Sequence, residues 1–363
     1  MGSLEIIVMS LGYVALLLWG VRMVRTGITR SFTSEVRHVI AVGASSRLRA
    51  AAVGVGITAL IQSSTAMCLI VSSFVARELL TLPVALAIML GADVGTTIAA
   101  LIFSIDLSWL PALLFAVGVI LFLSTDNDRR RSIGRVLIGL GLMLLSIRLL
   151  GQATADLRTS PGFLTVMTIV GSQPLLAAIV AGLVTWLAHS SLAIVLLVMS
   201  LAISAAISIP LAVALVVGAN AGGAIAPYVD QSGGLPAARR VALGNLIMRG
   251  SMAVIAIAAL YLPWLWLVEW FGLRPGAAVL ATHLVFNLLT AVVFLPFTER
   301  TTGVRPGANS ISARPVPRRL GSTPSTRPAN GGRDSVGASG QDLGASLPSS
   351  LSFHICLTDC RAT

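Results

Sequence analysis

Long hydrophobic stretches, separated by short polar and arginine-containing segments, run from the start of the chain to about residue 298. Runs of about 20 apolar residues have the length that an α-helix needs to cross a bilayer. They begin at residues 4–24 and recur up to 277–297. The pattern therefore predicts an all-α integral membrane protein with about eight spans. The first run lacks a basic leading segment and a small-residue cleavage site, which argues against a cleaved signal peptide.

One apolar run, residues 50–75, is interrupted in its middle by four polar residues, Gln62, Ser63, Ser64 and Thr65. An unsatisfied polar group in hydrocarbon costs several kcal/mol, so such clusters pair with each other, line a cavity or hold a substrate. Apolar arms of about a dozen residues flank the cluster, which predicts two half-length helices meeting near the membrane centre. The alternative is that these side chains only connect neighbouring helices by hydrogen bonds.

The same pattern returns 127 positions later without a gap. The segment Gln62-Ser63-Ser64 aligns with His189-Ser190-Ser191, and Pro83 aligns with Pro210. A glycine motif that contains Gly91, Asp93 and Gly95 aligns with one that contains Gly218, Asn220 and Gly222. We infer an internal duplication, with repeats over residues 1–150 and 151–298. Duplicated halves with interrupted apolar segments at matching places are typical of secondary transporters, whose binding site lies between the repeats.

Composition agrees with this class. The chain is 56% hydrophobic and 11% charged, with a mean hydropathy of +0.91, whereas a soluble domain carries about a quarter charged residues. The net charge is +11 and every basic residue is arginine. The arginines lie mainly between apolar runs, as the positive-inside rule expects, so we predict a lipid bilayer and no nucleic acid as partner. Arg22, Arg25, Arg30 and Arg37 place the end of the first run in the cytoplasm and the N-terminus outside.

Residues 299–363 differ from the rest. This segment is rich in Ser, Gly, Pro and Arg and has almost no apolar periodicity, which predicts a disordered tail. The spacing of its two cysteines, Cys356 and Cys360, is no metal signature. Cys68 lies in an apolar run and is expected to be an inert small hydrophobe.

The paired motifs over about residues 1–298 resemble those of the type II sodium–phosphate cotransporters, including bacterial members. The resemblance implies two inverted-topology repeats with re-entrant hairpins, whose polar clusters face each other in the membrane. It also implies sodium-coupled symport of inorganic phosphate by alternating access across the cytoplasmic (cell inner) membrane. We expect no enzymatic activity and no cofactor, sodium being the transported coupling ion. Many bacterial relatives continue into a PhoU-like domain, which residues 299–363 do not resemble. A reading-frame shift in the gene would give such a change.

The resemblance also implies which residues form the site. The first half-site would be Gln62, Ser63, Ser64 and Thr65, and the second would be His189, Ser190 and Ser191. Flanking contacts would come from the glycine motifs, through Asp93, Thr96, Thr97 and Asn220. The motif glycines Gly91, Gly95, Gly218 and Gly222 would act as backbone contacts or hinges. The sodium site is expected among Ser64, Thr65, Asp93, Ser191 and Asn220.

Two departures from the family pattern leave the ligands open. His189 stands where glutamine is usual, and Asp93 stands where asparagine is usual. A protonated histidine binds anions and a buried carboxylate carries protons, so another anion or proton coupling is an alternative. Asp93 could instead pair with a buried arginine such as Arg22 or Arg148.

Four further expectations concern single residues and the class of protein. We expect Arg249 to extend to the membrane surface, and His283 and Asn287 to connect helices rather than contact substrate. A Ser–His hydrolase is disfavoured, because helical neighbours such as His189 and Ser190 point about 100° apart and no nucleophile-elbow motif is present. The degenerate second half also permits a non-transporting remnant. Oligomeric state and transport direction are not predicted by these patterns.

Overall fold

Every regular element that the structure describes is a helix, which confirms the all-α prediction. The computed structural model describes residues 3–43, 46–104, 108–157 and 161–298, and these ranges contain no strand. The helices are α1 (Ser3–Gly43), α2 (Arg47–Ile61), α3 (Ser64–Ala76), α4 (Leu82–Phe103), α5 (Leu110–Leu123), α6 (Asp128–Leu157), α7 (Pro161–Gly171), α8 (Pro174–Ala188), α9 (Ser191–Ile203), α10 (Ile209–Gly222), α11 (Ile225–Asp230), α12 (Pro236–Ile255), η1 (Ala256–Leu260), α13 (Tyr261–Trp270), α14 (Pro275–Phe294) and η2 (Leu295–Thr298). The predicted tail and its two cysteines lie outside the described residues.

Six helical stretches in the described part of the chain are long and apolar enough to cross a membrane. They are Val8–Ser31, Leu82–Phe103, Asp128–Ala153, Ile209–Asp230, Pro236–Trp270 and Pro275–Thr298. The bent pair Thr165–Gly171 and Pro174–Ala188 would make a seventh. These counts leave out the shorter apolar helices α3, α5 and α9, which have 13 or 14 residues each, and the exact number of spans stays a prediction.

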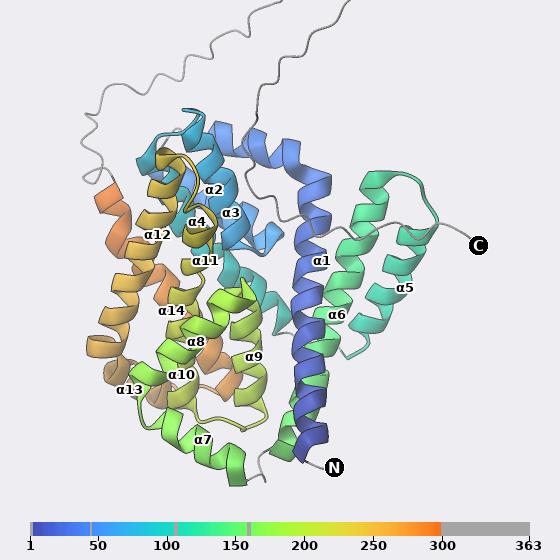
Figure 1. Cartoon of the computed structure of the whole chain (residues 1–363), viewed down its shortest axis with the longest axis vertical. Coiled ribbons are helices and arrows are strands. Elements are labelled where there is room, and N and C mark those ends of the chain that lie inside the picture. Colours follow the sequence, from blue (N-terminus) through green and yellow to red (C-terminus); the bar gives the residue numbers. More distant parts are fainter. Residues whose placement is uncertain (1–2, 44–45, 105–107, 158–160, 299–363) are drawn as a thin grey trace, which may run out of the picture. The chain divides into compact units, whose positions relative to one another are not determined.

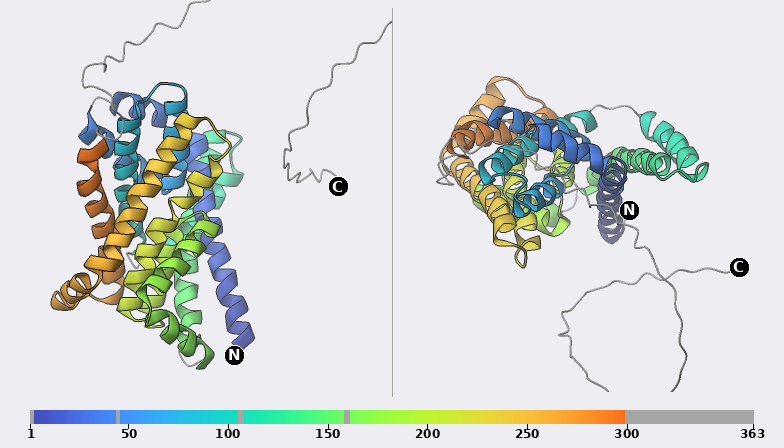
Figure 2. Two further views of the ribbon diagram at one scale, coloured as in Figure 1. Left: turned by 60° about the vertical axis from the view of Figure 1, so that its left-hand side comes forward. Right: turned by 90° about the horizontal axis from the view of Figure 1, so that it is seen from above.

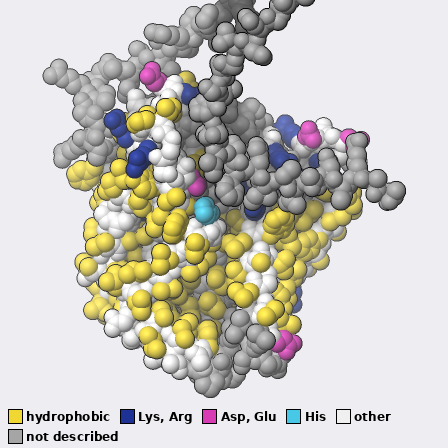
Figure 3. All heavy atoms as spheres, in the orientation of Figure 1, with side chains coloured by type: hydrophobic (Ala, Val, Ile, Leu, Met, Phe, Trp, Pro, Cys, Tyr) yellow, Lys and Arg dark blue, Asp and Glu magenta, His cyan; other side chains and the backbone are white. Residues whose placement is uncertain are grey.

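The surface fits a multi-pass membrane protein. Hydrophobic side chains cover most of the face in Figure 3, and Arg side chains gather toward its upper end. Large apolar residues such as Leu60, Leu123 and Trp270 are more than two-thirds exposed. Exposing many large apolar side chains is favourable only in an apolar environment such as the interior of a bilayer.

Both predicted interruptions are breaks between helices. Helices α2 and α8 have 15 residues each, and α3 and α9 have 13 each, so the two halves have arms of matching length. In Figure 1 and in the left view of Figure 2, α2 and α3 lie toward the upper end, whereas α8 and α9 lie toward the lower end. The two hairpins therefore enter from opposite ends, as the inverted repeats imply.

Glycines determine how closely the flanking helices pack. A methyl group added at Gly20 of α1 would meet the Gly139 carbonyl oxygen of α6 at 2.8 Å, and one at Gly139 would meet the Gly20 carbonyl oxygen at the same distance. Gly134 of α6 is packed in the same way against Gly118 of α5. Gly134 and Gly139 of α6 thus allow tight helix packing. The predicted boundary between residues 150 and 151 falls inside α6, and the exact repeat limits stay a prediction.

Candidate functional site

The first polar cluster forms the turn between α2 and α3. Gln62 ends α2 in the left-handed conformation, at φ 59°, and its N–H donates to the Thr58 carbonyl oxygen. Ser63 is extended and caps α3, because its Oγ accepts a hydrogen bond from the Ala66 N–H at 3.1 Å. Ser64 and Thr65 follow in the first turn of α3, both buried. The cluster thus supplies both the end of one helix and the start of the next.

The second cluster repeats this geometry residue by residue. His189 ends α8 at φ 53°, as Gln62 ends α2. Ser190 caps α9, and its Oγ accepts from the Ala193 N–H at 3.2 Å. Ser191 is buried in the first turn of α9. A left-handed conformation is unfavourable for residues other than glycine. Its occurrence at both aligned positions therefore supports the duplication independently of residue identity.

The glycine motifs hold each hairpin against the helix that follows it. A methyl group at Gly91 would overlap the carbonyl oxygen of Ala51, and one at Gly218 would overlap that of Ala178. These two carbonyls are themselves 127 positions apart. Gly95 and Gly222 make the equivalent contacts with α2 and α8. All four glycines are thus sites of close backbone contact, and α4 continues through its motif without unwinding.

Arg249 of α12 connects the two glycine motifs. Its side chain is 1% exposed, and its Nη1 lies 2.6 Å from Asp93 Oδ1. Its Nη2 donates to Asn220 Oδ1 at 3.2 Å. Asp93 and Asn220 are the aligned residues of the two repeats. The expectation that Arg249 extends to the surface was wrong, because pairing with Asp93 compensates the cost of burying both charges.

Arg249 was missed as a residue of this centre, and two other arginines, Arg22 and Arg148, were suggested as the partner of Asp93. Arg22 instead is exposed and lies over the Trp19 ring. The available signal was the position of Arg249 within the apolar residues 241–270, where an isolated arginine needs a buried partner.

The last helix, α14, completes the buried network. Thr96 Oγ1 donates to the Asp93 carbonyl oxygen at 2.6 Å, so it accepts from His283 Nε2 at 3.3 Å. His283 Nδ1 then accepts from Asn287 Nδ2, which also donates to Thr97 Oγ1 at 3.2 Å. This pattern requires the neutral histidine tautomer with its proton on Nε2. His283 and Asn287 connect helices, as expected.

Several buried polar atoms of this region have no hydrogen-bond partner among the described residues. They are Thr58 Oγ1, Gln62 Oε1, Asp93 Oδ2, Thr185 Oγ1, Asn245 Oδ1, Arg249 Nε and Asn287 Oδ1. Thr58 and Thr185 are another aligned pair, and both are 0% exposed. Buried polar atoms are rarely left without a partner, so these oxygens and the guanidinium N–H are candidate contacts for a ligand.

The two polar clusters differ in exposure. His189 is half exposed, and its Nε2 lies 3.9 Å from Asp230 Oδ1. The next residue, Gln231, is buried and donates to Cys68 Sγ of α3 at 3.8 Å. Helix α11 therefore contacts both hairpins. Within the described ranges no hydrogen bond or ion pair joins Gln62–Thr65 to His189–Ser191, so the prediction that both clusters hold one ligand stays a prediction.

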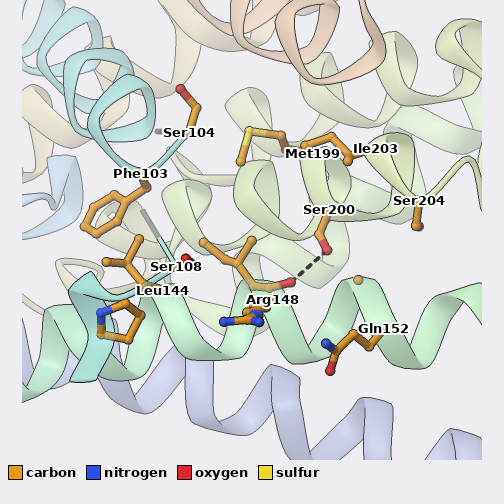
Figure 4. A pocket seen from close by; sticks show the side chains of 13 residues that line it. Phe103, Ser104, Ser108, Leu144, Arg148, Gln152, Met199, Ser200, Ile203 and Ser204 are labelled. Atoms are coloured by element: carbon orange, nitrogen blue, oxygen red, sulfur yellow. Dashed lines mark hydrogen bonds between the residues drawn. The ribbon is translucent and has the colours of Figure 1, made fainter. Parts of the chain in front are cut away.

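Arg148 lines a separate cavity of about 500 Å³ where α4, α5, α6 and α9 meet (Figure 4). Gln152, Ser104 and Ser204 lie around the same space, and Ser200 Oγ donates to the Ile147 carbonyl oxygen at 3.2 Å. Arg148 forms no ion pair with any described residue. The suggested Asp93–Arg148 pair is therefore absent from the described structure.

Comparisons with known proteins agree with the motifs. Residues 16–152 match the model of a family described as "Na+/Pi-cotransporter". A protein of Escherichia coli (strain K12), named "Putative inorganic phosphate export protein YjbB", is 38% identical over 294 residues. Residues 16–152 are thus similar to the Na+/Pi-cotransporter family. The alignment with YjbB covers 80% of the chain, so the likeness to YjbB reaches into both predicted repeats.

Other relatives match over a similar length of the chain. The YjbB protein of Salmonella typhimurium is 39% identical over 291 residues, which cover 80% of the chain. The chain spans 53% of the length of both YjbB proteins. "Uncharacterized protein YqeW" of Bacillus subtilis is 26% identical over 296 residues, covering 80% of the chain and 94% of that protein. No solved structure matches the chain.

Proposed function

We propose that this chain transports inorganic phosphate across the cytoplasmic membrane together with sodium, by symport and alternating access. The family match and the printed name of the YjbB relatives support phosphate as the substrate. The observation that carries the proposal is the buried contact of Arg249 with Asp93 and Asn220, because it joins the aligned motifs of both halves at one cationic group. A site at the repeat interface is the arrangement that alternating access uses.

The chemistry of the network suits both ions. A guanidinium group presents N–H donors in a geometry that matches phosphate oxygens, and Arg249 Nε has no hydrogen-bond partner within the described part of the chain. The N-termini of α3 and α9, at Ser63 and Ser190, add further donors and a partial positive charge. Sodium prefers oxygen ligands, which Asp93 Oδ2 and Asn287 Oδ1 supply.

Charge balance gives a physical reason for coupling. In the described state Asp93 and Arg249 neutralise each other. Phosphate bound alone at Arg249 would face the Asp93 carboxylate, and sodium bound alone at Asp93 would face the guanidinium. Two unit charges about 4 Å apart interact by about 4 kcal/mol at an effective dielectric constant of 20. Each ion therefore relieves the repulsion that the other would meet, so joint binding is favoured over either binding alone.

Phosphate uptake by proteoliposomes tests the proposal. Purified full-length chain is reconstituted, and entry of radiolabelled phosphate is measured with an inward sodium gradient and with sodium replaced by choline. We expect uptake that depends on the sodium gradient. Uptake indifferent to sodium would remove the coupling, and vesicles that transport no phosphate in either direction would remove the substrate. Loading phosphate inside the vesicles and reversing the gradient tests efflux, to which the name of the YjbB relatives refers.

Proton coupling is distinguished in the same vesicles. The alternative assigns proton transfer to Asp93 and His189. The structure places them differently, since Asp93 is buried beside Arg249 whereas His189 is half exposed beside Asp230. Protons would be favoured as the coupling ion if phosphate uptake is independent of sodium and depends steeply on pH, and if the variant Asp93→Asn abolishes this pH dependence. Sodium-dependent uptake with little response to pH supports the proposal.

A further inference from the structure

Three arginines surround a cavity at one end of the helix pair α1 and α6. Arg30 comes from α1, and Arg131 and Arg135 come from the first turns of α6. With Asp128 and Ser132 they line about 440 Å³ of space. None of these residues belongs to the buried network around Arg249, which involves α4, α10, α12 and α14.

The cavity carries unbalanced positive charge. Its lining holds three guanidinium groups and one carboxylate, so the formal charge is 3 − 1 = +2. Arg135 lies near enough to Arg30 and Arg131 for the like charges to repel one another. Within the described residues none of the three arginines forms an ion pair. Binding an anion would relieve this repulsion.

An aromatic ring keeps two of the arginines in place. The guanidinium carbons of Arg131 and Arg135 lie 4.8 and 5.6 Å from the centre of the Phe122 ring of α5. Cation–π contacts of this kind restrict the planar groups, so less freedom is lost when they bind an anion. The cavity is therefore preorganised by α5 and is more than a set of mobile surface charges.

The depth of the cavity indicates which anion it meets. The apolar span Val8–Ser31 ends one residue after Arg30, and the span Asp128–Ala153 begins at the cavity. The arginines thus lie where both spans reach their polar ends, at the level of lipid headgroups. Below them α5 presents exposed apolar side chains, including Val119 and Ile120, to the surrounding acyl chains.

We propose that this cavity binds the headgroup phosphate of an anionic phospholipid, whose acyl chains lie along the apolar surface of α5 and α6. The arginine-rich end is the one that the positive-inside rule places in the cytoplasm, where the leaflet is anionic. Basic pockets between membrane helices on that side recognise such headgroups. The site needs a phosphate attached to hydrocarbon and is separate from the transport site.

Native mass spectrometry of the purified full-length chain tests the site with phosphatidylglycerol and phosphatidylcholine as probes. We expect wild-type protein to prefer phosphatidylglycerol. The double variant Arg131→Gln/Arg135→Gln should bind it roughly 25-fold more weakly, at about fivefold per arginine. The matched control is Arg239→Gln/Arg240→Gln, which removes the same charge from exposed positions. Arg239 also stacks on an aromatic ring, Tyr228, at 5.4 Å, but it does not line the cavity.

Each outcome decides for or against the site. Loss of phosphatidylglycerol in the cavity variant and its retention in the control support the site. Equal binding of both lipids to wild type, an unaffected cavity variant, or an equal loss in the control overturns it. Complete displacement of the lipid by 10 mM inorganic phosphate, a value chosen to exceed about millimolar affinities, would show a free-anion site and also overturn it. If the double variant does not fold, Arg30→Gln is measured instead, with about a fivefold loss expected.

Discussion

Removing the charge of Arg249 should destabilise the protein far more than removing both charges of its ion pair. The variant Arg249→Gln leaves Asp93, which is 1% exposed, without the guanidinium 2.6 Å from its carboxylate. It also removes a hydrogen bond to Asn220. Breaking a buried pair from one side costs about 3–5 kcal/mol, because the remaining charge is buried without compensation. The double variant Asp93→Asn/Arg249→Gln has no such charge, so we expect it to cost about 1–2 kcal/mol.

The assay is equilibrium unfolding of the purified protein in mixed detergent micelles, for wild type, the two single variants and the double variant. The four free energies of unfolding form a double-mutant cycle. Because each single variant leaves a buried unpaired charge and the double variant leaves none, we expect a coupling energy of about 4–9 kcal/mol between Asp93 and Arg249. In proteoliposomes all three variants should lose sodium-driven phosphate uptake, although the double variant folds. A coupling energy below about 0.5 kcal/mol would refute the view that the pair is a desolvated interaction. Normal uptake by the double variant would refute its role in transport.

Three further predictions use matched positions of the chain. Gly218→Ala should destabilise the protein by more than about 2 kcal/mol, because the added methyl group overlaps the Ala178 carbonyl oxygen. The control Gly56→Ala has open space around the added methyl group and should stabilise the protein by up to about 1 kcal/mol. Similar thermal stability of the two variants would contradict the close packing at Gly218. Ser190→Ala and Ser208→Ala each remove a helix cap and should each cost about 1 kcal/mol in thermal unfolding. Only Ser190→Ala should reduce phosphate uptake, and equal transport by both variants would assign Ser190 a capping role alone. His189→Gly should leave the free energy of unfolding unchanged or raise it by up to about 1 kcal/mol, since glycine adopts the left-handed conformation without strain. A marked loss of stability would show that the His189 side chain supports the fold.

The broken helices could be predicted because each signal was local or repeated. Polar residues within an apolar run are costly in a membrane, and a polar residue followed by two serines occurred twice in one register. The structure confirmed the break at Gln62 and at His189, and it gave both the same backbone conformation. The exact number of spans stays a prediction, since hydropathy alone does not say which of the shorter apolar helices cross the membrane.

The centre of the candidate site could be predicted only in part. Asp93 and Asn220 were recognised from the glycine motifs, but the residue that joins them lies on α12, outside both motifs. Pairing between distant segments depends on how the helices pack. The sequence of an apolar stretch therefore does not predict which neighbouring helix its single arginine contacts. Thr96 and Thr97 were expected to contact ligand. In the structure both contact the last helix, through His283 and Asn287, and their contact with a ligand stays a prediction.

The Arg249 contact also has a consequence for the energetics of a cycle built from inverted halves. If the halves were identical, exchanging their conformations would give a state of equal energy, related by a two-fold rotation, that faces the opposite side. Here the shared guanidinium meets a carboxylate in one half and a neutral amide in the other. In the proposed cycle the two facing states would therefore differ in energy, and these three side chains would contribute to the difference.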